Sequence, residues 1–353
     1  MELLVETVKG FEEICKNELK QISDSVEIIK EMEGYLLIEG ELEDVFRLNY
    51  SSGTSNRIIH VLDHFKIEEP EDCYENLDFE VEEFIEPDQK FVVRVEKYVD
   101  DFKSTSLARE SGQKIVDSYS EEKGETLSVD LEEPDIVFRL YVFDEKTFFG
   151  FDTTGKPLND RAYLEKEVEV PPILANCLVR YSEWEGEEKM MDPFARDGVV
   201  AVEAARIVSN TPNKGRKFGF IDSKFYSNRA YSEIARKINE KMLVEETNIK
   251  ACEKDVSTIE KHAESASVNI EIDDTTALEN KLDGYHIVFD TPYIPRKSKR
   301  KQISRYMKDF EEKISSSDIK SLACTSRSEK FFEIFERKNK VEMESFKAYL
   351  FSF

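Results

Sequence analysis

A tetrapeptide directly after a short apolar run carries the most specific chemical signal in the sequence. Residues 287–289 have the composition of a buried strand, and they are followed by Asp290, Thr291, Pro292 and Tyr293. The Asp290 carboxylate and the Thr291 carbonyl can accept the N–H bonds of an exocyclic base amine and hold its nitrogen in line with a methyl donor. Tyr293 can stack on an extruded base. The pattern favours methyl transfer to such an amine, and a Pro-Tyr turn around a buried phenol is the structural alternative.

Three other polar loops are expected beside this tetrapeptide, because the carboxyl ends of parallel strands meet at one edge of a sheet. The first loop precedes a predicted helix and supplies four candidates for binding a nucleoside-type cofactor: Asp192, Pro193, Phe194 and Gly198. Gly198 permits close backbone approach, and the helix N-terminus presents free N–H groups. Glu253 follows a second strand and can accept hydrogen bonds from ribose hydroxyls, and Asp274 follows a third and can accept them from an adenine amino group. Each loop alone is also compatible with an ordinary turn or a solvated charge.

Basic residues gather next to the tetrapeptide although the chain as a whole is strongly acidic. Its 353 residues include 50 basic and 75 acidic side chains, so the formal net charge is −25. Such a chain repels polyphosphate, and a nucleic-acid partner would therefore require a local basic patch. The candidates for this patch are Arg296, Lys297, Lys299, Arg300 and Lys301. A weaker basic set consists of Arg94, Lys103, Arg109 and Lys114, and the alternative for either set is a solvated surface.

Composition argues against several other classes of protein. Five scattered cysteines form no CxxC pair and four histidines show no metal-ligand spacing, so neither a disulfide framework nor a metal centre is expected. The apolar runs are only a few residues long, whereas a transmembrane helix needs roughly 20. The N-terminus shows no basic-then-apolar signal segment, and we therefore expect a cytoplasmic protein without a membrane partner.

Two small α+β units are expected before the loops that could carry chemistry. In residues 1–56, hydrophobic periodicity predicts strands and helices alternating at 3–5, 11–22, 26–29, 35–38 and from 43 onward. The order strand, helix, strand, strand, helix is the beginning of a ferredoxin-like fold. In residues 57–155 we expect strands at 57–62, 91–95, 127–131, 136–143 and 147–151, with one helix ended by Gly124. Polar residues with Gly155 and Pro157 then predict a linker, over 156–170.

Residues 171–353 form a third unit in which short apolar strands alternate with longer helices. This alternation is typical of a parallel sheet covered on both faces, as in a Rossmann-like fold. Strands are expected at 189–191, 249–252, 286–289, 320–324 and 348–351. Helices are expected over 199–208, 231–242, 256–268 and 329–338. The predicted fold class is therefore a multidomain combination of α+β and α/β units.

With these motifs in order, nearly the whole chain resembles the THUMP-domain RNA methyltransferases that modify guanine N2. The resemblance rests on Asp192-Pro193, Gly198 and the segments 5–12 (VETVKGFE), 42–49 (LEDVFRLN), 54–57 (TSNR), 152–163 (DTTGKPLNDRAY), 203–205 (EAA) and 216–220 (RKFGF). It implies an N-terminal ferredoxin-like domain over 1–56, a THUMP domain over 57–155 that captures structured RNA, and a Rossmann-like methyltransferase domain over 171–353. It also implies S-adenosylmethionine as cofactor and a guanine of transfer RNA or large-subunit ribosomal RNA as substrate.

The chain departs from the family pattern at two chemically important positions. Arg196 stands where the first cofactor motif usually has a glycine, and Thr291 stands where the fourth motif usually has a proline. These departures motivate a second hypothesis, in which the chain is an inactive RNA-binding protein on a methyltransferase scaffold that partners an active homologue. Methylation of a protein or of DNA is a third hypothesis, against which the THUMP-like unit argues.

Overall fold

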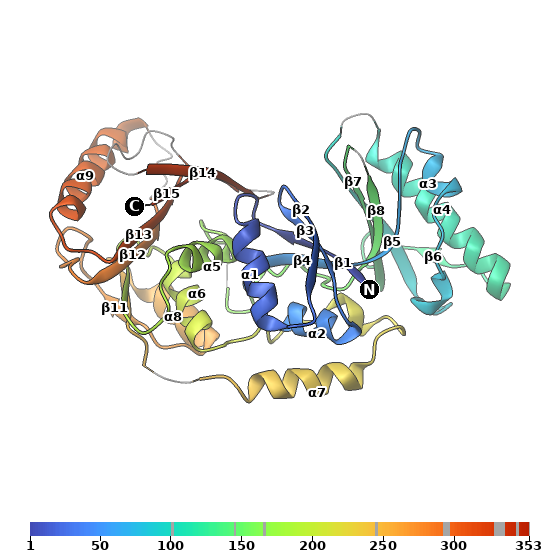
Figure 1. Cartoon of the computed structure of the whole chain (residues 1–353), viewed down its shortest axis with the longest axis horizontal. Helices are drawn as coiled ribbons and strands as arrows, with labels where there is room; N and C mark the ends of the chain where they lie inside the picture. The colour runs from blue at the N-terminus through green and yellow to red at the C-terminus, as the bar shows by residue number, and fades with distance from the viewer. Residues whose placement is uncertain are drawn as a thin grey trace.

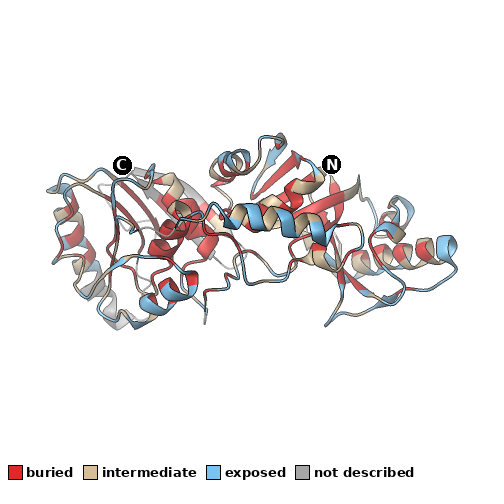
Figure 2. Cartoon of the chain, turned by 90° about the horizontal axis from the view of Figure 1, so that it is seen from below, coloured by how far each residue is buried: buried red, intermediate tan, exposed pale blue. Residues whose placement is uncertain are grey.

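Two β-sheets, one of eight strands and one of seven, organise the chain in the computed structural model. The model describes residues 1–99, 102–144, 146–164, 167–243, 246–291, 297–327, 336–343 and 346–352. The molecule is elongated, with the seven-stranded sheet at one end and the helix α4 (Ser104–Lys123) near the other (Figure 1). Buried residues follow the strands of both sheets and the inner sides of the helices that cover them (Figure 2).

The first unit has the predicted order of elements. They are β1 (Glu2–Thr7), α1 (Glu12–Ile22), β2 (Glu27–Met32), β3 (Tyr35–Glu39) and α2 (Leu42–Ser51). The apolar side chains that the 3.6-residue period placed on one face of α1, such as Cys15 and Leu19, are fully buried in the core. β1 lies between β3 and β4 (Ser55–Phe65) and pairs antiparallel with both.

The strand β4 joins the first unit to the second, because it pairs with β1 on one side and with β8 (Thr147–Asp152) on the other. The two units therefore share one sheet, in the order β2-β3-β1-β4-β8-β7-β5-β6. The remaining strands of this sheet are β5 (Lys90–Lys97), β6 (Ser128–Val129) and β7 (Ile136–Val142), and the second unit also contains the short helix α3 (Asp72–Glu75). Gly124 ends α4 in the left-handed conformation, with φ 73°, as expected of a helix-terminating glycine. The strand expected at 127–131 is only two residues long.

The third unit contains the predicted parallel sheet with an antiparallel edge. Its strand order is β11-β10-β9-β12-β13-β15-β14. The strands are β9 (Lys189–Asp192), β10 (Ile249–Cys252), β11 (Glu271–Asp273), β12 (Tyr285–Asp290), β13 (Ser321–Ser326), β14 (Glu336–Met343) and β15 (Phe346–Ser352). The helices are α5 (Pro172–Tyr181), α6 (Val199–Val208), α7 (Asn228–Asn239), α8 (Ser257–Ala266) and α9 (Lys297–Ser315). No helix among the described residues is long and apolar enough to cross a membrane.

Three predictions for this unit are wrong or incomplete. The helix expected over 329–338 is contradicted where the structure is described, because residues 336–338 lie in β14, which pairs with β15. The helix α9 was not foreseen, although Met307, Phe310 and Ile314 recur at helical spacing and are buried. The helix α7 begins three residues earlier than expected and lies along α2 rather than on the seven-stranded sheet (Figure 1).

A buried polar network attaches the unit of the seven-stranded sheet to the first unit. Glu203 on α6 is fully buried and receives hydrogen bonds from Arg161, Tyr163 and Asn176 at 2.9–3.2 Å. Arg161 in turn donates to the carbonyl of Gly53, at 2.8 Å, in the segment between α2 and β4. A second buried carboxylate, Glu18 on α1, pairs with Arg180 on α5 at 2.7 Å. The Arg161–Gly53 and Arg180–Glu18 contacts each join segments more than 100 residues apart in the sequence. The partners of Glu203 lie closer to it along the chain.

The network predicts that neutralising Glu203 destabilises the whole chain. Glu203→Gln keeps the shape of the side chain but leaves the Arg161 and Arg206 guanidiniums buried without their counter-charge. Removing one partner of a buried pair costs about 3–5 kcal/mol. Urea unfolding followed by the fluorescence of Trp184, the single tryptophan, will show this loss. The exposed control Glu187→Gln should stay within about 0.5 kcal/mol of the wild type, and an equally small effect of Glu203→Gln would contradict the assignment.

Candidate active site at the β9–β12 edge

The candidate site lies where the chain leaves two neighbouring parallel strands in opposite directions. β9 and β12 pair in parallel, and the next strand of the sheet is β10 on the β9 side and β13 on the β12 side. Such a switch point opens a crevice at the carboxyl ends of the strands. Asp192 is the last residue of β9 and Asp290 is the last residue of β12, so the fold brings these two predicted carboxylates to the crevice.

Arg196 crosses this crevice and bonds the Asp290 carboxylate. Its Nη2 lies 2.8 Å from Asp290 Oδ2, and its Nη1 bonds Glu169 in the segment before α5. The Thr325 hydroxyl donates to the other oxygen of Asp290 at 2.7 Å, so both carboxylate oxygens have partners. Arg196 has φ 52°, which is the left-handed region that glycine adopts most easily. The loop therefore keeps a glycine-like backbone while carrying a long cationic side chain.

Burial changes the acidity of both carboxyl groups. Asp192 and Asp290 are each 1% exposed. Burial raises the pKa of Asp192 to about 7, against the lowering effects of a hydrogen bond from the Phe194 N–H and of the Arg196 charge. Burial also raises the pKa of Asp290, and Arg196, Thr325 and Arg327 oppose this rise. The site thus holds two desolvated acids that differ in whether an arginine is bonded to them directly.

A cavity of about 720 Å³ opens beside Arg196. Arg196 lines this cavity and also bonds Asp290, which is not among the lining residues. Glu253 lines the far wall, and its Oε2 accepts a hydrogen bond from the Arg196 backbone N–H at 3.2 Å. The remaining lining residues are Glu167, Val168, Glu169, Pro171, Asp197, Asp255, Thr258 and Arg327. Five of the lining side chains are acidic and two are basic, so the walls favour a cationic ligand.

The other predicted cofactor residues lie at varying distance from this cavity. Gly198 is the N-cap of α6 with φ 79°, and a Cβ placed there would come within 2.7 Å of Ile259, so the position requires glycine. Phe194 packs among Phe289 and Phe310, with ring centroids 5.1 and 4.8 Å away, and Pro193 is buried beside it. Asp274 is exposed and does not line the cavity.

Part of the predicted catalytic and basic set lies outside the described residues. This applies to Pro292, Tyr293 and Arg296. Thr291 is buried, and its N–H donates to the Thr325 carbonyl at 2.9 Å. Four other basic candidates, Lys297, Lys299, Arg300 and Lys301, belong to the first turns of α9, where the structure describes only the backbone.

Sequence reasoning missed several residues that line the cavity. Glu169 and Arg327 come from segments that carry no periodic or motif signal, and they meet Arg196 only through the fold. Thr258 stands in the first turn of α8, five residues after Glu253, whereas Asp255 belongs to the loop after β10 that the sequence already singles out with Glu253. A polar residue in the first turn of the helix after Glu253 was the available signal for Thr258. Among the described residues, no group of three His, Cys, Asp or Glu side chains could hold a metal ion.

Comparisons with known protein families agree with the prediction of a methyltransferase domain in the third unit. Residues 163–350 match the family model described as an RMKL-like methyltransferase domain. The chain belongs to this RMKL-like methyltransferase family. Residues 2–59 match an RlmL ferredoxin-like domain and residues 76–152 match a THUMP domain. The predicted family and fold class are therefore confirmed.

Individual relatives extend the comparison over parts of the chain. It is 30% identical to a tRNA (guanine(6)-N2)-methyltransferase of Methanocaldococcus jannaschii, over 70% of this chain and 67% of that protein. A protein of the same name from Archaeoglobus fulgidus is 30% identical over 58% of this chain, which spans about half (53%) of that relative. A ribosomal RNA large subunit methyltransferase K/L of Psychromonas ingrahamii is 28% identical over 61% of this chain and 29% of its own length.

A solved structure shares the fold over the full length. It is described as a putative methyltransferase complexed with SAH, and it superposes with a TM-score of 0.86 at 18% identity, covering 100% of this chain and 97% of the other. At this identity the similarity shows a common arrangement of the ferredoxin-like, THUMP and methyltransferase domains.

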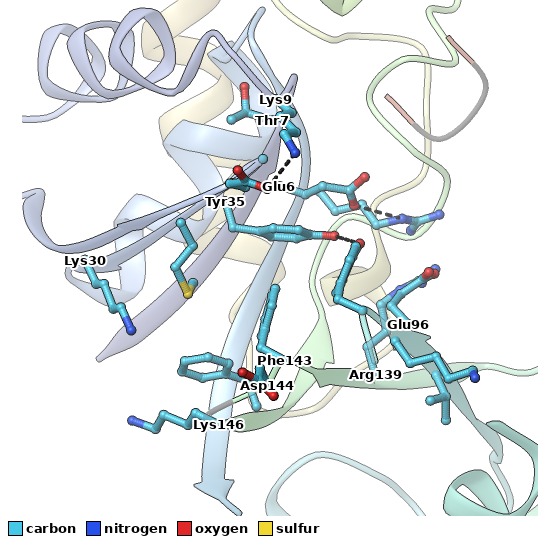
Figure 3. A pocket seen from close by; sticks show the side chains of 18 of the residues that line it. Glu6, Thr7, Lys9, Lys30, Tyr35, Glu96, Arg139, Phe143, Asp144 and Lys146 are labelled. Carbon is cyan, nitrogen blue, oxygen red and sulfur yellow. Dashed lines mark hydrogen bonds and ion pairs between the residues drawn. The ribbon is translucent and has the colours of Figure 1, made fainter. Parts of the chain in front are cut away.

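The RMKL-like chain has a second, larger cavity, which lies between its ferredoxin-like and THUMP domains. This cavity of about 1000 Å³ is on the face of the eight-stranded sheet opposite α1, α2 and α4, and it is lined by Lys30 of β2 and by Lys146, which directly precedes β8 (Figure 3). Tyr98 is 56% exposed and stacks on Phe143 with centroids 5.1 Å apart. Arg94 of the weaker basic set lines it.

The other members of the weaker basic set lie elsewhere in the THUMP domain. Lys103 and Arg109 are exposed on α4, and Arg109 pairs with Glu110. Lys114 lies over the ring of Tyr74, 5.6 Å from its centroid. Since α4 packs on β5 from the side opposite the cavity, these cations and the cavity face different directions.

The raised pKa of Asp192 predicts a pH dependence of stability in this methyltransferase domain. Its folded pKa of about 7 exceeds the reference value of 3.8, so the stabilising contribution is complete below about pH 4 and is lost as the pH rises through 7. Asp192→Asn removes the penalty, and its free energy of unfolding relative to the wild type should grow with pH by up to a few kcal/mol, at about 1.4 kcal/mol per pKa unit.

Urea unfolding of both proteins between about pH 5 and pH 8 measures this difference. The exposed variant Asp24→Asn serves as the control and should show a constant offset from the wild type. A difference for Asp192→Asn that stays flat over this range would show that Asp192 is ionised in the folded protein throughout it.

Proposed function

We propose that this chain transfers a methyl group from S-adenosylmethionine to the exocyclic N2 of a guanine in structured RNA, with transfer RNA as the first candidate and large-subunit ribosomal RNA as the second. The observation that carries the proposal is the pairing of a buried acceptor, Asp290, with a nucleoside-sized, acid-lined cavity at the switch point of an RMKL-like methyltransferase domain. The names of the archaeal and bacterial relatives support the guanine N2 position and the two RNA classes.

The residues of the cavity fit S-adenosylmethionine in size and charge. S-adenosylmethionine supplies an electrophilic methyl group on a cationic sulfur, which suits walls with five acids and two arginines. Glu253 accepts hydrogen bonds from the ribose hydroxyls, and the backbone at Gly198 faces the methionine end, beside Asp192, Pro193 and Phe194. Asp274, exposed outside the cavity, binds the adenine amino group only through a movement of its loop.

Asp290 and the Thr291 carbonyl hold the amine in line for methyl transfer. The nitrogen lone pair is delocalised into the guanine ring, so positioning of the amine provides much of the rate enhancement. The N–C bond forms as the C–S bond breaks, and the extra proton leaves the nitrogen afterwards to solvent. No strong base is therefore needed. We assign the stacking on the flipped base to Tyr293, which, like its neighbour Pro292 in the same motif, lies outside the described residues.

The RNA is held by regions outside the methyltransferase pocket. The THUMP domain and the cavity between it and the ferredoxin-like domain provide aromatic and basic side chains, which suit stacked bases and phosphates. We assign further phosphate contacts to Lys103, Arg109 and Lys114 on α4, and to Arg296, Lys297, Lys299, Arg300 and Lys301 beside the active site. We also place the protein in the cytoplasm, where it would meet these RNAs.

One observation favours the alternative of an inactive RNA-binding protein, namely the bond between Arg196 and Asp290. The named relatives are enzymes and lend this alternative no support. The two functions separate on one measurement, since an inactive scaffold binds RNA in a salt-dependent manner without binding cofactor. Competition between RNA and DNA for the same protein separates RNA methylation from the DNA alternative.

The proposal predicts different defects for two substitutions. Glu253→Ala should weaken cofactor binding in calorimetry about 10-fold or more, because a hydrogen bond to a charged group contributes about 1.5–3 kcal/mol. Asp290→Ala should retain cofactor binding but lose about 100-fold or more in transfer of labelled methyl to total RNA of the source organism, as expected when a transition-state contact is removed.

The matched control is Glu264→Ala, an exposed acid on α8, which should change neither quantity. A wild-type protein that binds no S-adenosylmethionine and methylates no RNA contradicts the proposal and supports the inactive alternative.

A further inference from the structure

We propose that Arg196 is a positioning residue for methyl transfer, whose guanidinium keeps Asp290 ionised and correctly oriented as the acceptor for the substrate amine. The inference rests on the proposed function, since it assigns a role within that same site. Arg196 stands at a position where the family pattern has glycine, and its loop retains a left-handed φ of 52°. A long cationic side chain in such a conformation requires a reason, and its contacts supply one.

The two contacts of Asp290 leave lone-pair positions unused on its carboxylate oxygens. A carboxylate offers about four lone-pair positions. Arg196 Nη2 occupies one on Oδ2, at 2.8 Å, and the Thr325 hydroxyl occupies one on Oδ1, at 2.7 Å. The remaining positions can accept the N–H bonds of a bound amine without displacing either partner. Because the two existing bonds fix both oxygens, the carboxylate plane is already oriented when the substrate arrives.

Arg196 is itself held from two other segments. Its Nη1 bonds the Glu169 carboxylate, and its backbone N–H donates to Glu253 Oε2 at 3.2 Å. Asp290 and Glu169 each bond a different terminal nitrogen of one planar guanidinium, an arrangement that the single ammonium of lysine cannot reproduce. The segment before α5, the end of β10 and the end of β12 are therefore tied together at this one side chain.

The charges around Asp290 explain why it needs this partner. Asp192 on the neighbouring strand and Asp197 in the loop are acids, Cys324 lies on β13, and Arg327 directly follows that strand. Burial raises the pKa of Asp290, and Arg196 is the foremost of the groups that lower it. Without Arg196, a desolvated carboxyl beside Asp192 would take up a proton near neutral pH. A protonated carboxyl presents a hydroxyl donor toward an amine that itself has only donors to offer.

The first test compares pH–rate profiles of Arg196→Gln, Asp290→Asn and the double variant in single-turnover methylation of RNA. Arg196→Gln should shift the acidic limb of the profile to higher pH by about one unit or more, because the ionised form of Asp290 then lacks its counter-charge. An amide oxygen accepts at any pH, so Arg196→Gln in the Asp290→Asn background should produce no such shift. The double variant also removes the unpaired buried carboxylate, so it should fold even where the single variant is unstable.

Arg196→Lys and Arg229→Gln complete the set. Arg196→Lys keeps the positive charge but has one terminal nitrogen in place of the two that bond Asp290 and Glu169. It should return the acidic limb of the pH–rate profile to its wild-type position while leaving part of the rate defect. Arg229→Gln, which alters an exposed arginine on α7, should match the wild type in every profile. If Arg196 merely obstructs the site, Arg196→Gln will bind cofactor more tightly and turn over faster at every pH, and this outcome overturns the inference. A uniform loss of rate without a pH shift overturns it as well.

A second readout is independent of turnover. Carbon-13 labelling of the aspartate carboxyls allows the signal of Asp290 to be identified by its absence in Asp290→Asn. Its titration midpoint should rise by about one unit or more in Arg196→Gln. An unchanged midpoint refutes the role of Arg196 even in an active enzyme. A further outcome is that the titration midpoint rises in Arg196→Gln while the wild-type chain transfers no methyl group. This result upholds the electrostatic role of Arg196 and refutes only the proposed function.

Discussion

Buried carboxylates that need a counter-charge determine how the segments of this chain come together. Four such groups each meet an arginine: Glu18 with Arg180, Asp152 with Arg57 and Arg139, Glu203 with Arg161, and Asp290 with Arg196. A charge removed from water is tolerated only when it is paired and hydrogen-bonded, so each arrangement strongly disfavours any packing that separates the partners. The Glu18–Arg180 pair joins α1 of the first unit to α5 of the third, and it therefore restricts a geometry that hydrophobic contact alone would leave adjustable, whereas the pairs of Asp152 act within the eight-stranded sheet.

At the active-site edge the same constraint takes on a chemical role. Glu203 is fully buried among its partners, whereas Asp290 lies at the end of a strand and is bonded to Arg196, which lines an acid-lined cavity. Its neighbour Asp192 has no arginine bonded to it, and burial raises its pKa to about 7. Two chemically identical side chains at the ends of adjacent strands thus have different electrostatic environments, because only one of them is bonded to Arg196.

Local patterns in the sequence were sufficient to predict most elements and the meeting of Asp192 with Asp290. The alternation of apolar strands and helices predicts a parallel sheet, and a parallel sheet brings the carboxyl ends of β9 and β12 together. The ion pair between Arg196 and Asp290 could not be predicted, since no spacing rule relates residues 94 positions apart. The packing of Phe194 against Phe310 could not be predicted either, because it depends on α9, and the basic residues in the first turns of α9 obscured its helical pattern.

The distribution of charge is compatible with the proposed RNA substrate and cationic cofactor, although the net charge of the chain is −25. The cavity beside Arg196 has five acids to two basic residues, whereas the cavity between the ferredoxin-like and THUMP domains has seven basic residues to five acids. Screening limits the reach of surface charges to about 8–10 Å, so each cavity responds to its own lining rather than to the net charge. In the proposed function, this distribution favours RNA at the face of the eight-stranded sheet that carries the larger cavity and disfavours it at the acid-lined cavity. The proposed guanine substrate would then reach the buried pair of Asp290 and Arg196 as a single extruded base.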